Sequence, residues 1–265
     1  MRKAKEFFGL ILRRLKNNYA VARLLIAART RGRAPVVVYQ MGKVGSTSIA
    51  HSISSQTGFP VFHFHKLCPK NLHRTRNNYE RAFYDTIVRP GREAMFITLV
   101  REPLGRNVSE FFQRIERKVA YKEQLTDYSP RKFFGLMAKD RRINSKIGWF
   151  DGELKPALGI DVYGKRFPKE KGSLEFRRGP FRLLVLKLEA SDRRKERALQ
   201  EFLGTGKIRL RSKNVGGEKF YSETYRKVGK TLKVPKSYVK KWHGSRYAKH
   251  FYTPQELKKA EKKWS

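Results

Sequence analysis

Residues 34–48 read APVVVYQMGKVGSTS and combine an apolar run with a turn rich in glycine and hydroxyl groups. The run Val36–Tyr39 has no polar face, which is typical of a strand buried on both sides in a parallel sheet. The turn over Gln40–Ser48 leads into an expected helix through Ile49. This order aims backbone N–H groups and the positive end of a helix at one point, where an anion can bind. The stretch therefore predicts an anion-binding strand–turn–helix unit.

The same alternation continues along the chain. Further apolar runs typical of strands occupy residues 60–65, 94–100 and 181–188. Helices are predicted over residues 70–88, from Pro103 onward and from Ser191 or Asp192 onward. Strands that alternate with helices predict an α/β fold with three layers, α/β/α, around a central parallel sheet. In such a fold, ligands bind at the carboxyl ends of the strands.

Composition limits the class of protein. The chain has 265 residues, 39% of them hydrophobic, and a formal net charge of +38 from 61 Lys and Arg against 23 Asp and Glu. The apolar content is too high for a wholly disordered basic tail, and the charge predicts an anionic partner. One cysteine, Cys68, excludes an internal disulfide and fits a reducing compartment. No apolar run approaches the length of a membrane span, so we expect a cytoplasmic protein.

Residues 1–33 are predicted to form a basic amphipathic helix in front of one α/β domain over residues 34–265. Apolar side chains recur there at helical spacing between Lys and Arg: Phe7, Phe8, Ile11, Leu12, Leu15 and Tyr19. The run Phe7–Leu12 is too short for a signal peptide. Two interpretations stay open, namely packing on the domain's own surface and peripheral docking on the inner face of an anionic membrane.

The glycine turn differs from the phosphate loop of nucleoside triphosphatases. In that loop a Lys directly precedes the Ser or Thr that binds the metal. Here Lys43 precedes Gly45, and Ser46 and Thr47 follow without a further Lys. This order disfavours Mg²⁺-dependent ATP hydrolysis, although a P-loop-type kinase or NTPase stays an alternative. Taken alone, the turn is equally compatible with an ordinary strand–helix connection.

Two motifs together are similar to the sulfotransferase family, whose members use 3′-phosphoadenosine 5′-phosphosulfate (PAPS) as donor. Lys43-Val44-Gly45-Ser46-Thr47-Ser48 resembles the family's loop for the 5′-phosphosulfate. Arg101, at the end of the third predicted strand, and Ser109, eight residues later, resemble the pair that holds the 3′-phosphate. The resemblance implies a P-loop-like sulfotransferase architecture with PAPS as co-substrate and no required metal.

A third motif resembles the family more loosely. Residues 209–219 form a basic loop with two glycines, similar to the loop that closes over the nucleotide product in many sulfotransferases. The resemblance implies Lys213 and Lys219 as further phosphate ligands. A solvated basic turn is the alternative.

Strand alternation over residues 61–67 sends His63 and His65 to one face of the second predicted strand. An imidazole with a pKa near neutrality suits a general base. The resemblance implies that His65 takes the acceptor's proton while Lys43 stabilises the leaving phosphate, with His63 as the fallback. Other members of the family use a Glu as the base, so Glu153 and Asp151 stay further candidates for this role. Structural roles for the histidines stay open, and a metal site is disfavoured because no third ligand is nearby.

Residues 147–163 combine aromatic and acidic side chains between glycines. Such a segment can bind a sugar, or it can form a hydrophobic plug with Trp149 in the core. It resembles bacterial chains grouped as capsular-polysaccharide synthesis proteins. We therefore expect sulfuryl transfer from PAPS to a hydroxyl or amine of a carbohydrate or glycoconjugate. A non-enzymatic protein that binds polyanions or nucleic acid is the alternative from another class, although no RNA-recognition signature is present.

Overall fold

A computed structural model describes residues 32–72, 78–117, 129–211 and 231–265, together with Tyr19, Ala22 and Ile26. The predicted basic helix over residues 1–33 therefore lies almost wholly outside the described residues. Tyr19 and Ile26 are helical and exposed. Within the described part of the chain, no helix has both the length and the apolar character needed to cross a bilayer.

The strands are β1 (Val36–Tyr39), β2 (Val61–Phe64), β3 (Ala94–Val100), β4 (Ser173–Arg178) and β5 (Phe181–Lys187). They form one sheet in the order β2-β1-β3-β5-β4. The four strands predicted from the sequence pair in parallel, with Val38 beside His63 of β2 and beside Ile97 of β3. The predicted α/β fold with a central, largely parallel sheet is confirmed.

One strand was not predicted. β4 pairs antiparallel with β5 at the edge of the sheet, joined to it by a turn at Gly179 and Pro180. Its residues Glu175, Arg177 and Arg178 are exposed, so β4 lacks the continuous apolar run that marks the other strands. A Gly-Pro pair in front of an apolar strand was the available signal of a hairpin.

The helices of the described residues are α2 (Ser46–Gln56), α3 (Pro69–Leu72), α4 (Asn78–Phe83), η1 (Tyr84–Val88), α5 (Pro103–Arg117), α7 (Pro130–Lys139), α8 (Arg141–Asn144), η2 (Ser145–Gly148), η3 (Phe150–Leu154), α9 (Lys155–Leu158), η4 (Val162–Gly164), α10 (Asp192–Leu203), α12 (Lys236–His243), α13 (Arg246–Phe251) and α14 (Pro254–Trp264). The helices predicted from Pro103 and from Ser191 are confirmed as α5 and α10, with Ser191 as the N-cap of α10. The predicted helix over residues 70–88 corresponds to α3, α4 and η1.

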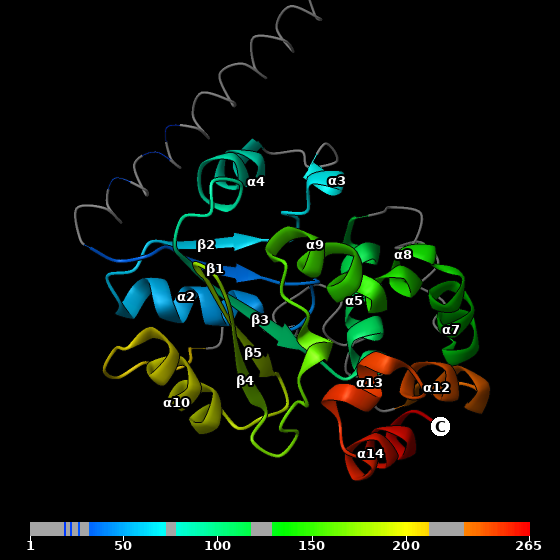
Figure 1. The fold of residues 1–265 in the computed structure, drawn as a ribbon. Helices are drawn as coiled ribbons and strands as arrows, with labels where there is room; N and C mark the ends of the chain where they lie inside the picture. Colours follow the sequence, from blue (N-terminus) through cyan, green and yellow to red (C-terminus); the bar gives the residue numbers. More distant parts are fainter. Residues whose placement is uncertain are drawn as a thin grey trace, which may run out of the picture.

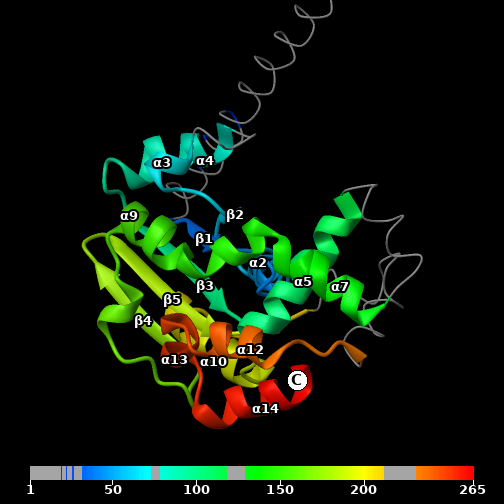
Figure 2. The same cartoon turned by 90° about the vertical axis from the view of Figure 1, so that its right-hand side faces the viewer.

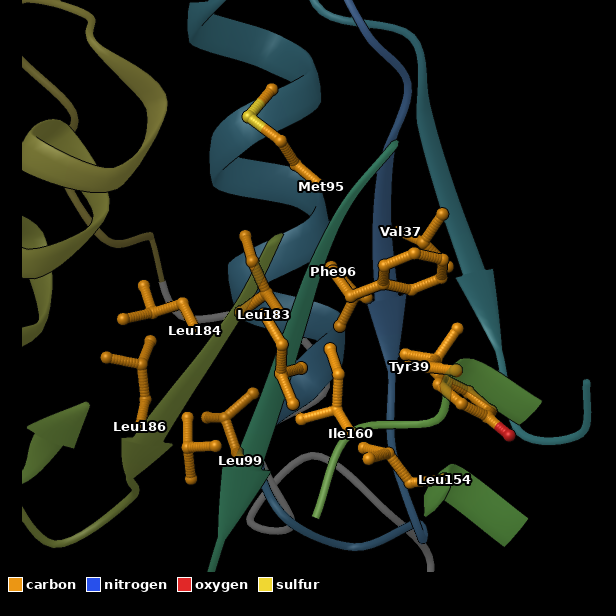
Figure 3. Close-up of a cluster of buried hydrophobic side chains, with 14 of the residues drawn as sticks. Val37, Tyr39, Met95, Phe96, Leu99, Leu154, Ile160, Leu183, Leu184 and Leu186 are labelled. Carbon is orange, nitrogen blue, oxygen red and sulfur yellow. The ribbon is translucent and has the colours of Figure 1, made fainter. Parts of the chain in front are cut away.

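Helical segments cover both faces of the sheet (Figure 1). On one face, Phe202 of α10 lies 4.7 Å from the guanidinium of Arg182 on β5. On the other face, Tyr39 of β1 packs edge-on against Trp149, with ring centroids 4.9 Å apart. Figure 3 shows Tyr39 together with Leu154 of η3 on this second side. Trp149 is thus part of a hydrophobic plug, as one of the two interpretations of this segment held.

A second apolar cluster lies beyond the carboxyl ends of the strands (Figure 1). It joins α5, α7, α12 and α14 through Phe111, Phe133, Trp242 and Trp264. Figure 2 shows α12, α13 and α14 next to one another at this end of the molecule. The loops that follow β1 and β3 therefore lie between the sheet and a packed helical cluster, which is where an α/β fold places a ligand.

We expect Gly45→Ala to destabilise the protein strongly. Gly45 has a φ of 79°, and a Cβ at this position would lie 2.6 Å from Leu188 Cδ1. Left-handed strain and overpacking together predict a loss of about 2–4 kcal/mol in the free energy of unfolding. Gly32→Ala is the matched control, because Gly32 also has a positive φ but has nothing within 4 Å. Denaturant unfolding measures both variants, and equal losses would show that Leu188 moves aside without cost.

Candidate functional site

The glycine turn forms a backbone cradle at the carboxyl end of β1. Gly42, Lys43 and Gly45 have left-handed φ values of 94°, 62° and 79°. Lys43 is the one residue other than glycine with a positive φ in the described ranges. Strain of this kind at a side-chain-bearing residue is typical of functional loops. Because Ser46 then begins α2, the backbone N–H groups of the turn and the positive helix end belong to the same site.

Arg101 extends from the end of β3 to this turn. Its Nη1 donates to the carbonyl oxygen of Lys43 at 3.0 Å. The hydroxyl of Tyr247 on α13 fixes the Arg101 backbone, because it accepts from the Arg101 N–H at 2.9 Å and donates to the Arg101 carbonyl at 3.0 Å. The two predicted phosphate motifs therefore lie in direct contact.

Ser109 lies on the side of α5 along which the Arg101 side chain runs. The Nε and Nη2 atoms of Arg101 lie 3.7 and 3.8 Å from the point where a Cβ on Gly105 would stand. Ser109 is four residues beyond Gly105 in the same helix, so both are on one helical face. Ser109 thus lies on the helix face that the Arg101 side chain approaches, and its role as a phosphate ligand stays a prediction.

The structure describes some of the other predicted phosphate ligands and leaves others outside the described residues. Val44 and Ser46 are buried, while Thr47 and Ser48 are half-buried in the first turn of α2. Lys213 and Lys219 lie outside the described residues, so their role stays a prediction.

His63 and His65 lie beside the turn, and Gln40 connects them. The Gln40 Nε2 is 3.2 Å from His63 Nε2 and 3.2 Å from His65 Nδ1. The Oγ of Ser46 lies 3.0 Å from His63 Nε2. The two imidazole centroids are 5.2 Å apart, whereas both phenylalanines of β2 pack on α4. The predicted alternation along β2 is confirmed, and the histidines face the anion cradle's own helix.

Gln40 determines the hydrogen-bond surroundings of both rings. The Gln40 Oε1 accepts from the N–H of Gly42, so its Nε2 donates, and His63 Nε2 is an acceptor. Desolvation of the partly exposed His63 ring and the nearby His65 lower the pKa of His63 to about 4, so this ring is neutral at pH 7. The Nδ1 of His65 lies 3.0 Å from the Gln40 carbonyl, which only accepts. The donating Gln40 Nε2 lies 3.2 Å from the same nitrogen, so His65 Nδ1 faces both a donor and an acceptor of Gln40.

Glu153, one of the reserve bases, is 4% exposed and surrounded by donors. Its Oε1 accepts from the backbone N–H groups of Leu67 and Cys68 at 2.6 and 2.7 Å and from the Tyr39 hydroxyl at 2.7 Å. Its Oε2 accepts from Asn71 Nδ2 at 2.5 Å. These bonds tie η3 to the chain that follows His65, which gives the carboxylate a structural role.

Asp151, the other reserve base, is exposed at the surface. Its carboxylate lies 3.9 Å from Arg246 Nη1, and the Arg246 guanidinium stacks 4.1 Å from the ring centroid of Tyr163. An acidic and a basic side chain thus meet at the surface, and the guanidinium covers the half-buried Tyr163 ring.

Two residues of the site, Gln40 and Tyr247, were not predicted from the sequence. Gln40 follows the strand directly, and its only signal was a polar side chain after four apolar ones. Tyr247 comes from the far end of the chain, and nothing in the sequence connects it to Arg101.

The carboxylates nearest to Arg101 are occupied by structural contacts. Glu102 accepts from the N–H groups of Leu104 and Gly105 and contacts His243. Glu189 accepts from the Glu102 N–H and from the Tyr252 hydroxyl. Among the residues that the structure describes, no three His, Cys, Asp or Glu side chains gather as they would around a metal ion.

Comparison with known families finds one match. A family model described as "Putative capsular polysaccharide synthesis protein" matches residues 133–253. The matched region includes Trp149, Glu153 and Tyr247, whereas Lys43, His65 and Arg101 precede it. Neither the curated proteins nor the solved structures yielded a significant match. The C-terminal part of the chain is thus similar to proteins linked to capsular polysaccharide synthesis.

We expect Glu153→Ala to destabilise the fold. The substitution leaves the buried N–H groups of Leu67 and Cys68 without an acceptor, whereas the Tyr39 hydroxyl keeps the Glu153 carbonyl and Asn71 is half-buried. Each unsatisfied buried donor costs about 1–3 kcal/mol, so the free energy of unfolding should fall by at least about 2 kcal/mol. Asp151→Ala, in the same segment but exposed, should change it by less than about 0.5 kcal/mol. Denaturant unfolding compares the two. If Glu153→Ala is as stable as the unmodified protein, the structural role is wrong and Glu153 becomes a candidate base again.

Proposed function

We propose that the protein is a PAPS-dependent sulfotransferase that modifies a carbohydrate or glycoconjugate. One observation carries the proposal, which is the contact between Arg101 Nη1 and the Lys43 carbonyl at 3.0 Å. It joins a cradle suited to a 5′-phosphosulfate to an arginine suited to a 3′-phosphate. A single nucleotide with phosphates at both positions has the charge distribution that this pair of anion sites requires.

The proposed reaction is an in-line transfer of a sulfuryl group. The bond from sulfur to the bridging phosphate oxygen breaks, and a bond from sulfur to the acceptor oxygen or nitrogen forms. Adenosine 3′,5′-bisphosphate leaves, and Lys43 with the backbone N–H groups of the turn stabilises the negative charge on its 5′-phosphate. The acceptor's proton moves to Nε2 of His65, in the tautomer whose Nδ1–H donates to the Gln40 carbonyl.

The acceptor class rests on the C-terminal part of the chain. The match to a capsular polysaccharide family model covers the segment that holds Asp151, Tyr163 and Arg246. The exposed Asp151 and Arg246 offer both charge signs, a combination suited to the hydroxyl and acidic groups of a polysaccharide. The net charge of +38 also favours an acidic polysaccharide over a neutral one.

Nucleotide binding tests the donor. Adenosine 3′,5′-bisphosphate should raise the melting temperature without Mg²⁺, and a free concentration of 100 Kd corresponds to about 2.7 kcal/mol of stabilisation. Arg101→Gln should remove most of this shift. Arg177→Gln, which deletes an exposed arginine on β4, is the charge-matched control and should keep it. A shift with ATP and Mg²⁺ alone would favour a kinase, and oligonucleotide binding that survives Arg101→Gln would favour a nucleic-acid-binding protein.

Turnover tests the base. With sulfur-35-labelled PAPS and a panel of capsular polysaccharides, His65→Ala should reduce label transfer at least 100-fold and leave the thermal shift by adenosine 3′,5′-bisphosphate intact. His63→Gln keeps an acceptor for Ser46 and should retain most of the transfer. Full activity of His65→Ala together with loss in His63→Gln would move the role of base to His63.

A further inference from the structure

Arg106 carries a buried charge that the fold leaves incompletely paired. The residue lies in the first turns of α5 and is 3% exposed. Its Nη2 donates to Asn107 Oδ1 at 2.6 Å and to the Ile143 carbonyl at 3.1 Å. Its Nη1 is buried and has no hydrogen-bond partner among the described residues. Both acceptors of Nη2 are neutral, so neither compensates the positive charge.

The carboxylate closest to Arg106 along α5 is already engaged. Glu110 pairs with Arg114 at 3.5 Å, and its Oε2 lies 3.8 Å from the point where a Cβ on Gly42 would stand. No salt bridge joins Arg106 to a carboxylate within the described ranges. Burial lowers the pKa of the Arg106 guanidinium and the neighbouring Arg101 acts in the same direction, whereas the charge of Glu110 opposes them. Glu110, which also pairs with Arg114, thus compensates the charge of Arg106 from a distance but leaves its Nη1 without an acceptor.

The position of Arg106 connects it to the anion site. The Arg101 side chain lies beside Gly105, and the Glu110 carboxylate lies beside Gly42 of the glycine turn. Gly105 and Glu110 border one face of α5. Helical spacing places Arg106 and Ser109 between them on that face, one turn apart. Arg106 therefore lies on the helix face that the turn and Arg101 approach, beside the residue expected to bind the 3′-phosphate.

A buried guanidinium with an unsatisfied N–H is costly, and a bound anion that accepts from this N–H would remove the cost. We propose that Arg106 is a second cation of the 3′-phosphate site and that its Nη1 donates to a phosphate monoester dianion on the bound nucleotide. This inference rests on the proposed function. It identifies the Arg106 guanidinium as a group that distinguishes a nucleotide with a 3′-phosphate from one without it.

The test is the ratio of two dissociation constants, for adenosine 5′-monophosphate and adenosine 3′,5′-bisphosphate, measured by calorimetry. Arg106→Gln removes the charge but keeps an amide donor for the Ile143 carbonyl. We expect it to lower the ratio at least tenfold and to leave the affinity for the monophosphate within twofold. Arg106→Lys keeps the charge without the fork and should lower the ratio less. Arg177→Gln is the control and should leave the ratio unchanged.

Each outcome decides the inference. A ratio retained in Arg106→Gln would make Arg106 a structural residue, because a purely structural role has no reason to discriminate between the two nucleotides. If Arg106→Gln does not fold, Arg106→Lys decides, and a ratio within twofold of the unmodified protein overturns the inference. A ratio near one in the unmodified protein would instead contradict the proposed function, since the 3′-phosphate would then have no site.

Discussion

The hydrogen bond from Arg101 Nη1 to the Lys43 carbonyl is the contact on which the site depends, and the sheet makes it possible. β1 and β3 pair in parallel with Val38 beside Ile97, so the chains that leave both strands emerge at the same edge. The short β1 ends first and turns through the left-handed Gly42 and Lys43, while β3 continues to Arg101. Parallel pairing thus brings together two loops that are far apart in the sequence.

The C-terminal half of the chain supports this edge of the sheet through side-chain contacts. Tyr247 fixes the backbone of Arg101 with two hydrogen bonds, and Glu153 fixes the segment after His65 with three and the Tyr39 hydroxyl of β1 with one. Both residues lie in the region that matches the capsular polysaccharide family model, whereas Lys43 does not. The matched region therefore determines how rigidly the N-terminal loops are held.

The sequence predicted the parts of this structure that depend on local pattern. Apolar runs defined four strands, and alternation placed His63 and His65 on one face, because both signals arise within a few residues. β4 was missed since its exposed polar residues hide its pairing with β5. The contacts of Gln40 and Tyr247 could not be predicted either, because they join residues 25 and 146 positions apart through the tertiary fold.

Charge and geometry contribute differently to the site. The chain has 61 Lys and Arg against 23 Asp and Glu, and several of the acidic residues are used for structural contacts, among them Glu102, Glu153 and Glu189. The resulting field attracts any polyanion and weakens with salt, so it cannot by itself select a ligand. Selection requires fixed donors at a fixed spacing. The strained turn at Lys43 and the guanidinium of Arg101, both held by backbone hydrogen bonds, provide that spacing, and the excess of positive charge determines only how fast an anion arrives.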